Sequence, residues 1–244
     1  MKKKIAILGS TGTIGTTTLK IIKKTNKFRV FLLLANSNIS KILKQIKEYK
    51  PRIVVITNEE SYFKIKDKSG NKKVIFLNDL KSINKYLKKI DITVSAIPGI
   101  AGLNPTIQFT KLSKKILIAN KESVVCGWNI INNIAKKNKT EIVPVDSEHF
   151  SIKQLTKNYS NDDIEKIYIT ASGGPFLTLK KNNFKKIKPK AALNHPKWKM
   201  GAKISIDSAT MMNKVLELIE ALRLFPYKFD KYEIVIHPQS LVHA

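Results

Sequence analysis

The 244-residue sequence contains little cysteine, few acidic side chains and no long apolar run. Its single cysteine, Cys126, excludes an internal disulfide and a metal site built from several cysteines, and it is typical of a reducing cytoplasm. No stretch approaches the roughly 18 apolar residues of a membrane span. The apolar stretch after the basic N-terminus covers only residues 5–8, which is too short for a signal peptide. We therefore expect a cytoplasmic protein without a transit peptide, although a plastid-type organelle is not excluded.

Acidic residues are scarce: 18 stand against 45 basic ones, which gives a formal net charge of +27. This charge raises the alternative of a basic nucleic-acid-binding protein. The basic residues are spread along the whole chain, however, and only Arg29, Arg52 and Arg223 are arginines, the residue preferred for reading bases. We favour a solvated lysine-rich surface that binds no specific nucleic acid but still attracts anions, including phosphorylated metabolites.

Short β-branched runs alternate with helical stretches over residues 1–145. We predict strands at 5–8, 30–35, 53–57, 74–77, 92–97, 116–119 and 142–145, and helices at 16–24, 39–49, 105–112 and 122–136. After Asp146 the rhythm changes, with strands predicted at 167–170, 204–206 and 233–236, a helix at 208–224, and little periodicity over 178–203. The pattern predicts an α/β fold: a parallel sheet with helices on both faces (1–145), followed by an α+β domain (146–244).

A glycine-rich loop, Gly9-x-x-Gly12-x-x-Gly15, lies between the first predicted strand and helix. Such glycines let the backbone approach a pyrophosphate, and the helix start offers free N–H groups, as in Rossmann-like domains. The second strand ends in Ala35-Asn36-Ser37-Asn38, with no carboxylate for the ribose 2′-hydroxyl of NAD and with Lys41 one turn later. This favours NADP(H). The alternatives are a tight turn without a ligand, and asparagines that only shape that turn.

Carboxylates follow the strand predicted at 142–145. In an extended chain, Asp146 and Glu148 would face the same side and present paired oxygens to Mg²⁺ or Mn²⁺. The helix at 208–224 has an apolar stripe of Met211, Val215, Leu218 and Leu222, with Asn213, Lys214, Glu217 and Glu220 on the other side. The alternatives are a solvated turn and an amphipathic surface helix.

Three further positions are candidates for ligand contacts. Ser172, followed by two glycines, suits a phosphate or hydroxylated ligand, or forms a plain turn. Trp198 and His195 lie in the aperiodic segment and predict a substrate lid, unless Trp198 docks on the protein's own surface. Lys121 begins a helix at the carboxyl end of a strand, where it would steady an oxyanion or pair with Glu122.

Together these segments resemble the 1-deoxy-D-xylulose 5-phosphate reductoisomerase family of the non-mevalonate isoprenoid pathway. The matching stretches are GSTGTIG at 9–15, ANKES at 119–123, PVDSEH at 144–149, TASGGPF at 170–176, HPKWKMG at 195–201, IDSATMMNK at 206–214 and IHPQS at 236–240. The resemblance implies rearrangement of a ketose phosphate to a branched aldehyde. It also implies reduction of that aldehyde by NADPH to 2-C-methyl-D-erythritol 4-phosphate, with Mn²⁺, Mg²⁺ or Co²⁺ as Lewis acid.

The resemblance also implies roles for individual residues. Asp146, Glu148 and Glu217 would bind the metal, and Lys121, Glu148 and His195 would be catalytic. The implied substrate-binding residues are Lys121, Ser147, Glu148, Ser172, His195, Trp198, Ser208, Asn213, Lys214 and Glu217, with Met200 also in the closing loop. The implied cofactor-binding residues are Thr11, Gly12, Thr13, Ile14, Asn36, Ser37, Asn38, Ala96, Asn120, Glu122 and Gly201.

Some features depart from the family pattern. Asn36 and Val215 stand where glycine is usual, and Leu177 where a basic residue is common. Family members continue past 236–240 into a further strand and a C-terminal helical domain, so we expect a C-terminally truncated chain whose full-length form is a homodimer. This leaves an inactive fragment as one alternative. A Rossmann-type aldehyde dehydrogenase with Cys126 as nucleophile is another.

Overall fold

The computed structural model describes residues 2–69, 73–196 and 201–244. The chain separates into two compact units, Met1–Val145 and Asp146–Ala244, and each is described by itself. Among the described residues, no helix is both long enough and apolar enough to cross a membrane. The cytoplasmic location stays a prediction.

The described part of the first unit contains a seven-stranded sheet whose strands are all parallel. Its strands are β1 (Lys3–Leu8), β2 (Phe28–Ala35), β3 (Ile53–Ile56), β4 (Ile75–Leu77), β5 (Ile90–Ser95), β6 (Ser113–Ile118) and β7 (Glu141–Pro144). Their order is β4-β3-β2-β1-β5-β6-β7. The predicted α/β parallel sheet is confirmed. The order reverses between β1 and β5, which is where ligands bind in open sheets of this kind.

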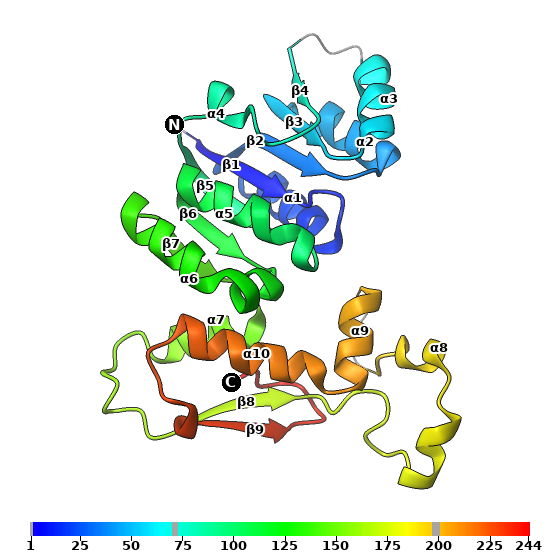
Figure 1. The fold of residues 1–244 in the computed structure, drawn as a ribbon, viewed down its shortest axis with the longest axis vertical. Coiled ribbons are helices and arrows are strands. Elements are labelled where there is room, and N and C mark those ends of the chain that lie inside the picture. The colour runs from blue at the N-terminus through cyan, green and yellow to red at the C-terminus, as the bar shows by residue number, and fades with distance from the viewer. Residues whose placement is uncertain (1, 70–72, 197–200) are drawn as a thin grey trace. The chain divides into compact units, whose positions relative to one another are not determined.

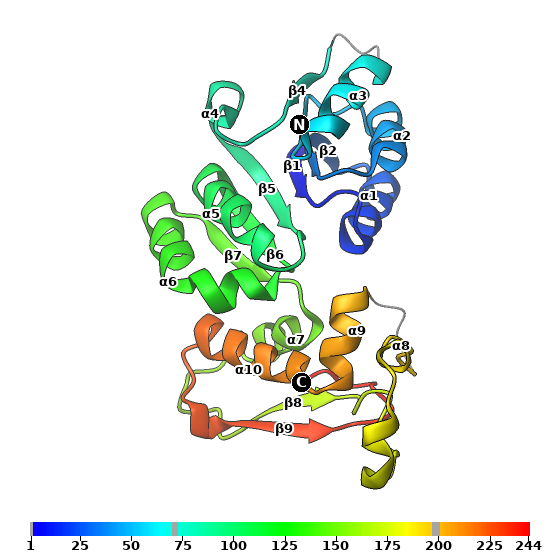
Figure 2. The same cartoon turned by 45° about the vertical axis from the view of Figure 1, so that its right-hand side comes forward.

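Helices connect the strands on both faces of this sheet. They are α1 (Thr13–Thr25), α2 (Ile39–Tyr49), α3 (Glu59–Ser69), α4 (Ile83–Tyr86), the 3-10 turn η1 (Ile100–Gly102), α5 (Leu103–Leu112) and α6 (Lys121–Asn138). Figures 1 and 2 show α1, α2 and α3 on one face and α5 and α6 on the other. This is the arrangement that right-handed crossovers produce when the strand order reverses.

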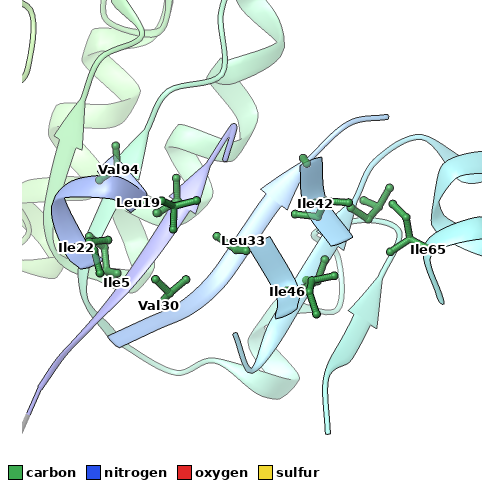
Figure 3. Packing of buried hydrophobic residues seen from close by; sticks show 13 residues of the cluster. Ile5, Leu19, Ile22, Val30, Leu33, Ile42, Ile46, Ile65 and Val94 are labelled. Atoms are coloured by element: carbon green, nitrogen blue, oxygen red, sulfur yellow. The ribbon is translucent and has the colours of Figure 1, made fainter. Parts of the chain in front are cut away.

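A buried aliphatic cluster joins the sheet to α1, α2 and α3. Leu33 of β2 is fully buried in it, beside Ile5 and Val30 from the strands. Figure 3 shows these side chains meeting Leu19 and Ile22 of α1 and Ile42 and Ile46 of α2, with Ile65 of α3 close by. Because the strands are held in register by this core, the loops at their carboxyl ends have fixed positions.

The second unit packs helices against a two-stranded parallel sheet. Its elements are α7 (Ser147–Leu155), β8 (Ile167–Ala171), η2 (Lys181–Lys186), α8 (Pro189–Ala192), α9 (Ala202–Ala209), α10 (Met212–Leu224), η3 (Phe229–Lys231) and β9 (Tyr232–Ile236). Its core includes Ile152 of α7, Ile169 of β8 and Ala221 of α10. This core ties α7 and α10 to the same sheet (Figure 1).

Two predicted elements of the second unit are wrong. The strand predicted at 204–206 lies inside helix α9, because a three-residue apolar run does not distinguish strand from helix. The single helix predicted at 208–224 is two helices, separated at Met211, which has a left-handed backbone with φ of 61°. The chain therefore changes direction just before Asn213 and Lys214.

The end of β9 and the segment after it leave apolar side chains in solvent. Ile234, Val235 and Ile236 are exposed, as are Leu241 and Val242. The last residues return to β8, where the Thr170 N–H donates to the His243 carbonyl (3.1 Å). Among the described residues, β9 pairs only with β8.

Candidate active site

The glycine-rich loop lies at the point where the strand order reverses, and two of its glycines have no room for a side chain. A Cβ at Gly9, whose φ is +83°, would be 2.7 Å from the Ala96 carbonyl oxygen at the end of β5. A Cβ at Gly15 would be 2.4 Å from the Gly9 carbonyl oxygen. Glycine therefore lets the loop pass between β5 and the start of α1, which explains the motif on packing grounds.

The start of α1 is open to solvent. Gly12, Thr13 and Ile14 are exposed, and the first turn of α1, all of it described, has neither an acidic residue nor a side-chain cap. The Thr16 hydroxyl donates to the Gly12 carbonyl (2.7 Å) and so does not cap the N–H groups of the first turn, which have no partner within a helix. Such a terminus attracts anions.

The residues after β2 shape a turn, as the alternative interpretation holds. The Asn38 side chain caps α2 by accepting the Lys41 N–H (3.0 Å), and Asn36 accepts from the Thr57 hydroxyl (3.2 Å). The Lys41 ammonium donates to the Thr11 carbonyl (3.2 Å) and so brings a positive charge to the glycine-rich loop. A contact of Asn36, Ser37 or Asn38 with a 2′-phosphate stays a prediction.

Asn120 ties the end of β6 to the loop after β5. Its amide donates to the carbonyls of Ile97 (2.6 Å) and Gly99 (3.0 Å) and to Glu122 (3.0 Å), while its oxygen accepts the Ser123 N–H and caps α6. These bonds give the Asn120 side chain a structural role. Lys121 is buried in the first turn of α6. Its contact with substrate, and those of Ala96, Asn120 and Glu122 with cofactor, stay predictions.

The three predicted metal ligands meet in the second unit. One oxygen from each of Asp146, Glu148 and Glu217 lies within 4.8 Å of the others. The reason given for the first pair is wrong, because the chain is not extended there. Asp146 caps α7 by accepting the Ser147 N–H (2.9 Å), and Glu148 lies in the first turn of that helix. Asp146 and Glu148 converge because both lie at the start of α7, and Glu217 joins them from α10.

A lysine neutralises part of this acidic group. The Lys214 ammonium lies 3.1 Å from Glu148 Oε1 and forms an ion pair with Glu217 Oε2. Burial, followed by the charge of Glu217, raises the pKa of Glu148, and Lys214 opposes that increase. Three buried or half-buried carboxylates, two of them paired with one ammonium, are a strongly anionic set of oxygen donors, and hard divalent cations prefer such oxygens. The residues present therefore fit a divalent cation.

The buried face of α10 is only partly the one predicted, because Leu218 and Leu222 of the apolar stripe pack against the core of the unit but polar residues from the other side are buried as well. Lys214, Glu217 and Glu220 are buried, whereas Val215 of the predicted apolar stripe is 45% exposed. Asn213 donates to Glu217 Oε1. The predicted contacts of Asn213 and Lys214 with a substrate phosphate stay predictions. At its exposed position, Val215 does not crowd the described contacts of its own unit.

A second polar group forms where the loop after β8 meets α9. Ser172 Oγ lies 3.0 Å from His195 Nε2, and burial lowers the pKa of His195. A Cβ at Gly174, with φ of +70°, would be 2.7 Å from the Ser208 carbonyl oxygen, so the loop lies against the end of α9. The structure thus brings the Ser172 and His195 side chains together and places the backbone of Ser208 against the same loop.

The remaining predicted positions differ in their relation to these groups. Ser147 donates to Glu148 (2.8 Å), and Gly201 is the exposed N-cap of α9. Trp198 and Met200 lie outside the described residues. Sequence reasoning missed His149 and Glu220, which form a second group with Asp146. The only signal for His149 was its place beside Glu148.

Comparisons with known proteins match both units. A sequence profile for 1-deoxy-D-xylulose 5-phosphate reductoisomerase matches residues 5–127, and one for the C-terminal domain of that enzyme matches residues 142–225. The chain belongs to the 1-deoxy-D-xylulose 5-phosphate reductoisomerase family. Family membership removes the support for an aldehyde dehydrogenase using Cys126, which is exposed on α6.

Relatives within the family are similar over nearly the whole chain. The reductoisomerase of Pelagibacter ubique (strain HTCC1062) is 50% identical over 99% of this chain and 63% of its own length. That of Clostridium kluyveri is 44% identical over 99% of this chain and 64% of its own. The Zymomonas mobilis enzyme in complex with NADPH superimposes with a TM-score of 0.90 at 36% identity, covering 100% of this chain and 63% of that one.

A second solved structure of the family also matches nearly the whole chain. A DOX-P reductoisomerase in complex with NADPH, fosmidomycin and magnesium superimposes with a TM-score of 0.90 at 39% identity, covering 99% of this chain and 62% of that one. The chain thus spans about 63% of the length of the relatives it matches.

Proposed function

We propose that this protein converts 1-deoxy-D-xylulose 5-phosphate to 2-C-methyl-D-erythritol 4-phosphate with NADPH and a divalent cation. The observation that carries the proposal is the meeting of Asp146, Glu148 and Glu217 in a chain of this family. Relatives with bound NADPH and magnesium support both cofactors. The proposal makes the chain an oxidoreductase and isomerase rather than an inactive fragment.

The three carboxylates would hold Mg²⁺, Mn²⁺ or Co²⁺ through their oxygens. When bound, such an ion supplies Lewis-acid polarisation of the ketose carbonyl and the adjacent hydroxyl. Without a cation, the Lys214 ammonium balances part of the negative charge of Glu148 and Glu217. Glu148 and Glu217 would also orient the substrate.

The group formed by Ser172, His195 and Ser208 would hold the substrate phosphate, together with Asn213 and Lys214. The short contact between the Ser172 hydroxyl and the His195 ring supports this role, because both can donate to a phosphate oxygen. By resemblance to the family, Trp198 and Met200 would complete the closing loop, and Lys121 and Ser147 would bind the hydroxyl end of the sugar.

NADPH would bind to the first unit. The exposed start of α1, with Thr11, Gly12, Thr13 and Ile14, would receive its pyrophosphate. Asn36 and Ser37 would donate hydrogen bonds to the 2′-phosphate, with Lys41 nearby. The end of β2 has no acidic residue that would repel this phosphate. Bound NADPH would supply the hydride for the reduction.

The test follows NADPH absorbance with 1-deoxy-D-xylulose 5-phosphate, with and without Mn²⁺, beside direct titrations of NADPH and Mn²⁺. We expect turnover that needs the cation and is lost in Glu217→Gln. The matched control Glu233→Gln, exposed on β9, keeps it. Undiminished turnover in Glu217→Gln would overturn the metal assignment. Binding of both ligands without turnover would overturn catalysis by this chain and leave the two binding sites.

We also propose that the full-length form is a homodimer. The resemblance to the family supports this proposal, and the apolar side chains left in solvent by β9 and residues 241–242 mark a surface that other residues would cover. Light scattering of the full-length protein at micromolar concentration should give twice the mass of one chain. A monomer mass over that range would contradict the proposal.

A further inference from the structure

A buried histidine connects the two helices that carry the metal-ligand candidates. His149 follows Glu148 in α7, and its Nε2 lies 2.8 Å from the backbone carbonyl oxygen of Glu217 in α10. A carbonyl only accepts hydrogen bonds, so Nε2 must carry a proton and donate it. The bond therefore connects His149, which follows the candidate ligand Glu148, to the backbone of the candidate ligand Glu217.

The other side of the same ring faces a buried carboxylate. His149 Nδ1 lies 3.5 Å from Glu220 Oε2, and the two side chains are 0% and 2% exposed. Glu220 lies on the same buried face of α10 as Glu217, one turn later. The pair is thus shielded from water, where electrostatic interactions are stronger than at the surface.

An aromatic ring fixes the plane of the imidazole. Phe225, which follows α10, stacks on His149 with ring centroids 6.4 Å apart and an interplanar angle of 19°. The imidazole is therefore held by a carbonyl, a carboxylate and an aromatic ring, all from α10 or the residue after it. A rotation of the ring would break all three contacts, so α7 and α10 keep one relative position at Glu217.

We propose that His149 and Glu220 are positioning residues that set the distance between Glu217 and the carboxylates of Asp146 and Glu148. This inference rests on the proposed metal-binding function. Without this connection, the core and the Lys214–Glu148 ion pair still hold α10 beside α7, but the backbone at Glu217 loses its direct hydrogen bond to α7 and the Glu217 carboxylate is positioned less exactly for a shared cation. Polar groups behind metal ligands typically change metal affinity by about 10–100-fold when they are removed.

The test titrates Mn²⁺ into the full chain and measures thermal unfolding without metal. His149→Leu removes the hydrogen bond and should weaken Mn²⁺ binding by about 10–100-fold. His149→Gln keeps a donor amide toward the Glu217 carbonyl and should recover most of the affinity. The control Ile169→Ala truncates a fully buried core residue of the same unit, so it should lower the melting temperature but leave Mn²⁺ affinity unchanged.

The possible outcomes separate the positioning role from its alternatives. Mn²⁺ affinity of His149→Leu within twofold of the unsubstituted chain would overturn the positioning role, as would an equal loss in Ile169→Ala. If His149→Leu fails to fold, Glu220→Gln undergoes the same titration with the same criterion. A second Mn²⁺ per chain that disappears in Glu220→Gln would make the pair ligands instead, because both lie within 4.8 Å of Asp146. Absence of Mn²⁺ binding to the unsubstituted chain would instead refute the proposed metal function.

Discussion

Replacing Lys214 by methionine is expected to destabilise the metal-free second unit strongly. Lys214 is 6% exposed and lies between Glu148, 12% exposed, and Glu217, 2% exposed. Methionine keeps most of the volume but removes the ammonium, which leaves buried carboxylates without their counter-charge. Breaking a buried ion pair from one side typically costs about 3–5 kcal/mol.

A matched control lies on the surface of the same unit. Lys203 pairs with Asp207 four residues later in α9 (2.6 Å), but its side chain is 47% exposed. Exposed pairs at this spacing contribute about 0.3–0.5 kcal/mol, so Lys203→Met should change stability little. The two variants make the same chemical change and differ in burial.

The assay is urea unfolding at pH 7, followed by far-UV circular dichroism, first in EDTA and then with Mn²⁺. In EDTA, Lys214→Met should lower the free energy of unfolding by about 3–5 kcal/mol, whereas Lys203→Met should lower it by at most about 0.5 kcal/mol. Mn²⁺ should stabilise Lys214→Met more than the unsubstituted chain, since the cation restores the missing positive charge. Equal stability of the two variants in EDTA would refute the reasoning.

Three further outcomes are expected in the first unit. Gly15→Ala forces a Cβ to within 2.4 Å of the Gly9 carbonyl oxygen, so the free energy of unfolding should fall by about 1–3 kcal/mol. Fluorescence titrations of the same variant should show weaker NADPH binding. An unchanged free energy of unfolding together with unchanged NADPH affinity would contradict this. A hydrogen bond from Lys114 lowers the pKa of Asp91, so Asp91 stabilises the fold above its unfolded-state pKa of about 3.9 and loses that effect as pH falls through its lower folded-state pKa. Asp91→Asn should therefore be less stable at pH 7 in urea unfolding and approach the unsubstituted chain in acid; a constant difference would be inconsistent. Leu33→Ala should cost about 3–5 kcal/mol in the same assay, and a loss under 1 kcal/mol would contradict its place in the core.

The sheet could be predicted from the sequence because its strands are continuous buried runs. A stretch such as Leu32–Leu34 is apolar on both faces of its strand, as a strand inside a parallel sheet must be. It can therefore be recognised from the local sequence alone. Helix α3 was missed because its sequence is mostly polar and only Ser61 and Ile65 are buried. The break at Met211 was missed because a left-handed methionine has no local sequence signal.

The candidate site was predicted by motif and not by periodicity. An amphipathic pattern indicates which face of a helix is apolar, and it placed Glu217 on the solvent side of its helix. The structure buries that side because α7 supplies polar partners: Glu148 contacts the Lys214 ammonium, and His149 contacts the Glu217 carbonyl. Partners that are distant in sequence cannot be read from a local pattern. Asp146 and Glu148 were paired for the wrong local reason, since a helix start rather than a strand holds them.

The two sets of candidate ligand groups belong to different units of the chain. The glycine-rich loop lies before Val145, whereas every carboxylate of the cation group lies from Asp146 onward. Each affinity can therefore be measured while the other site is impaired by substitution. If the affinity for NADPH changes when the cation site is saturated, the ratio of the two NADPH affinities gives the coupling free energy between the sites. By reciprocity, saturating NADPH must change the cation affinity by the same ratio.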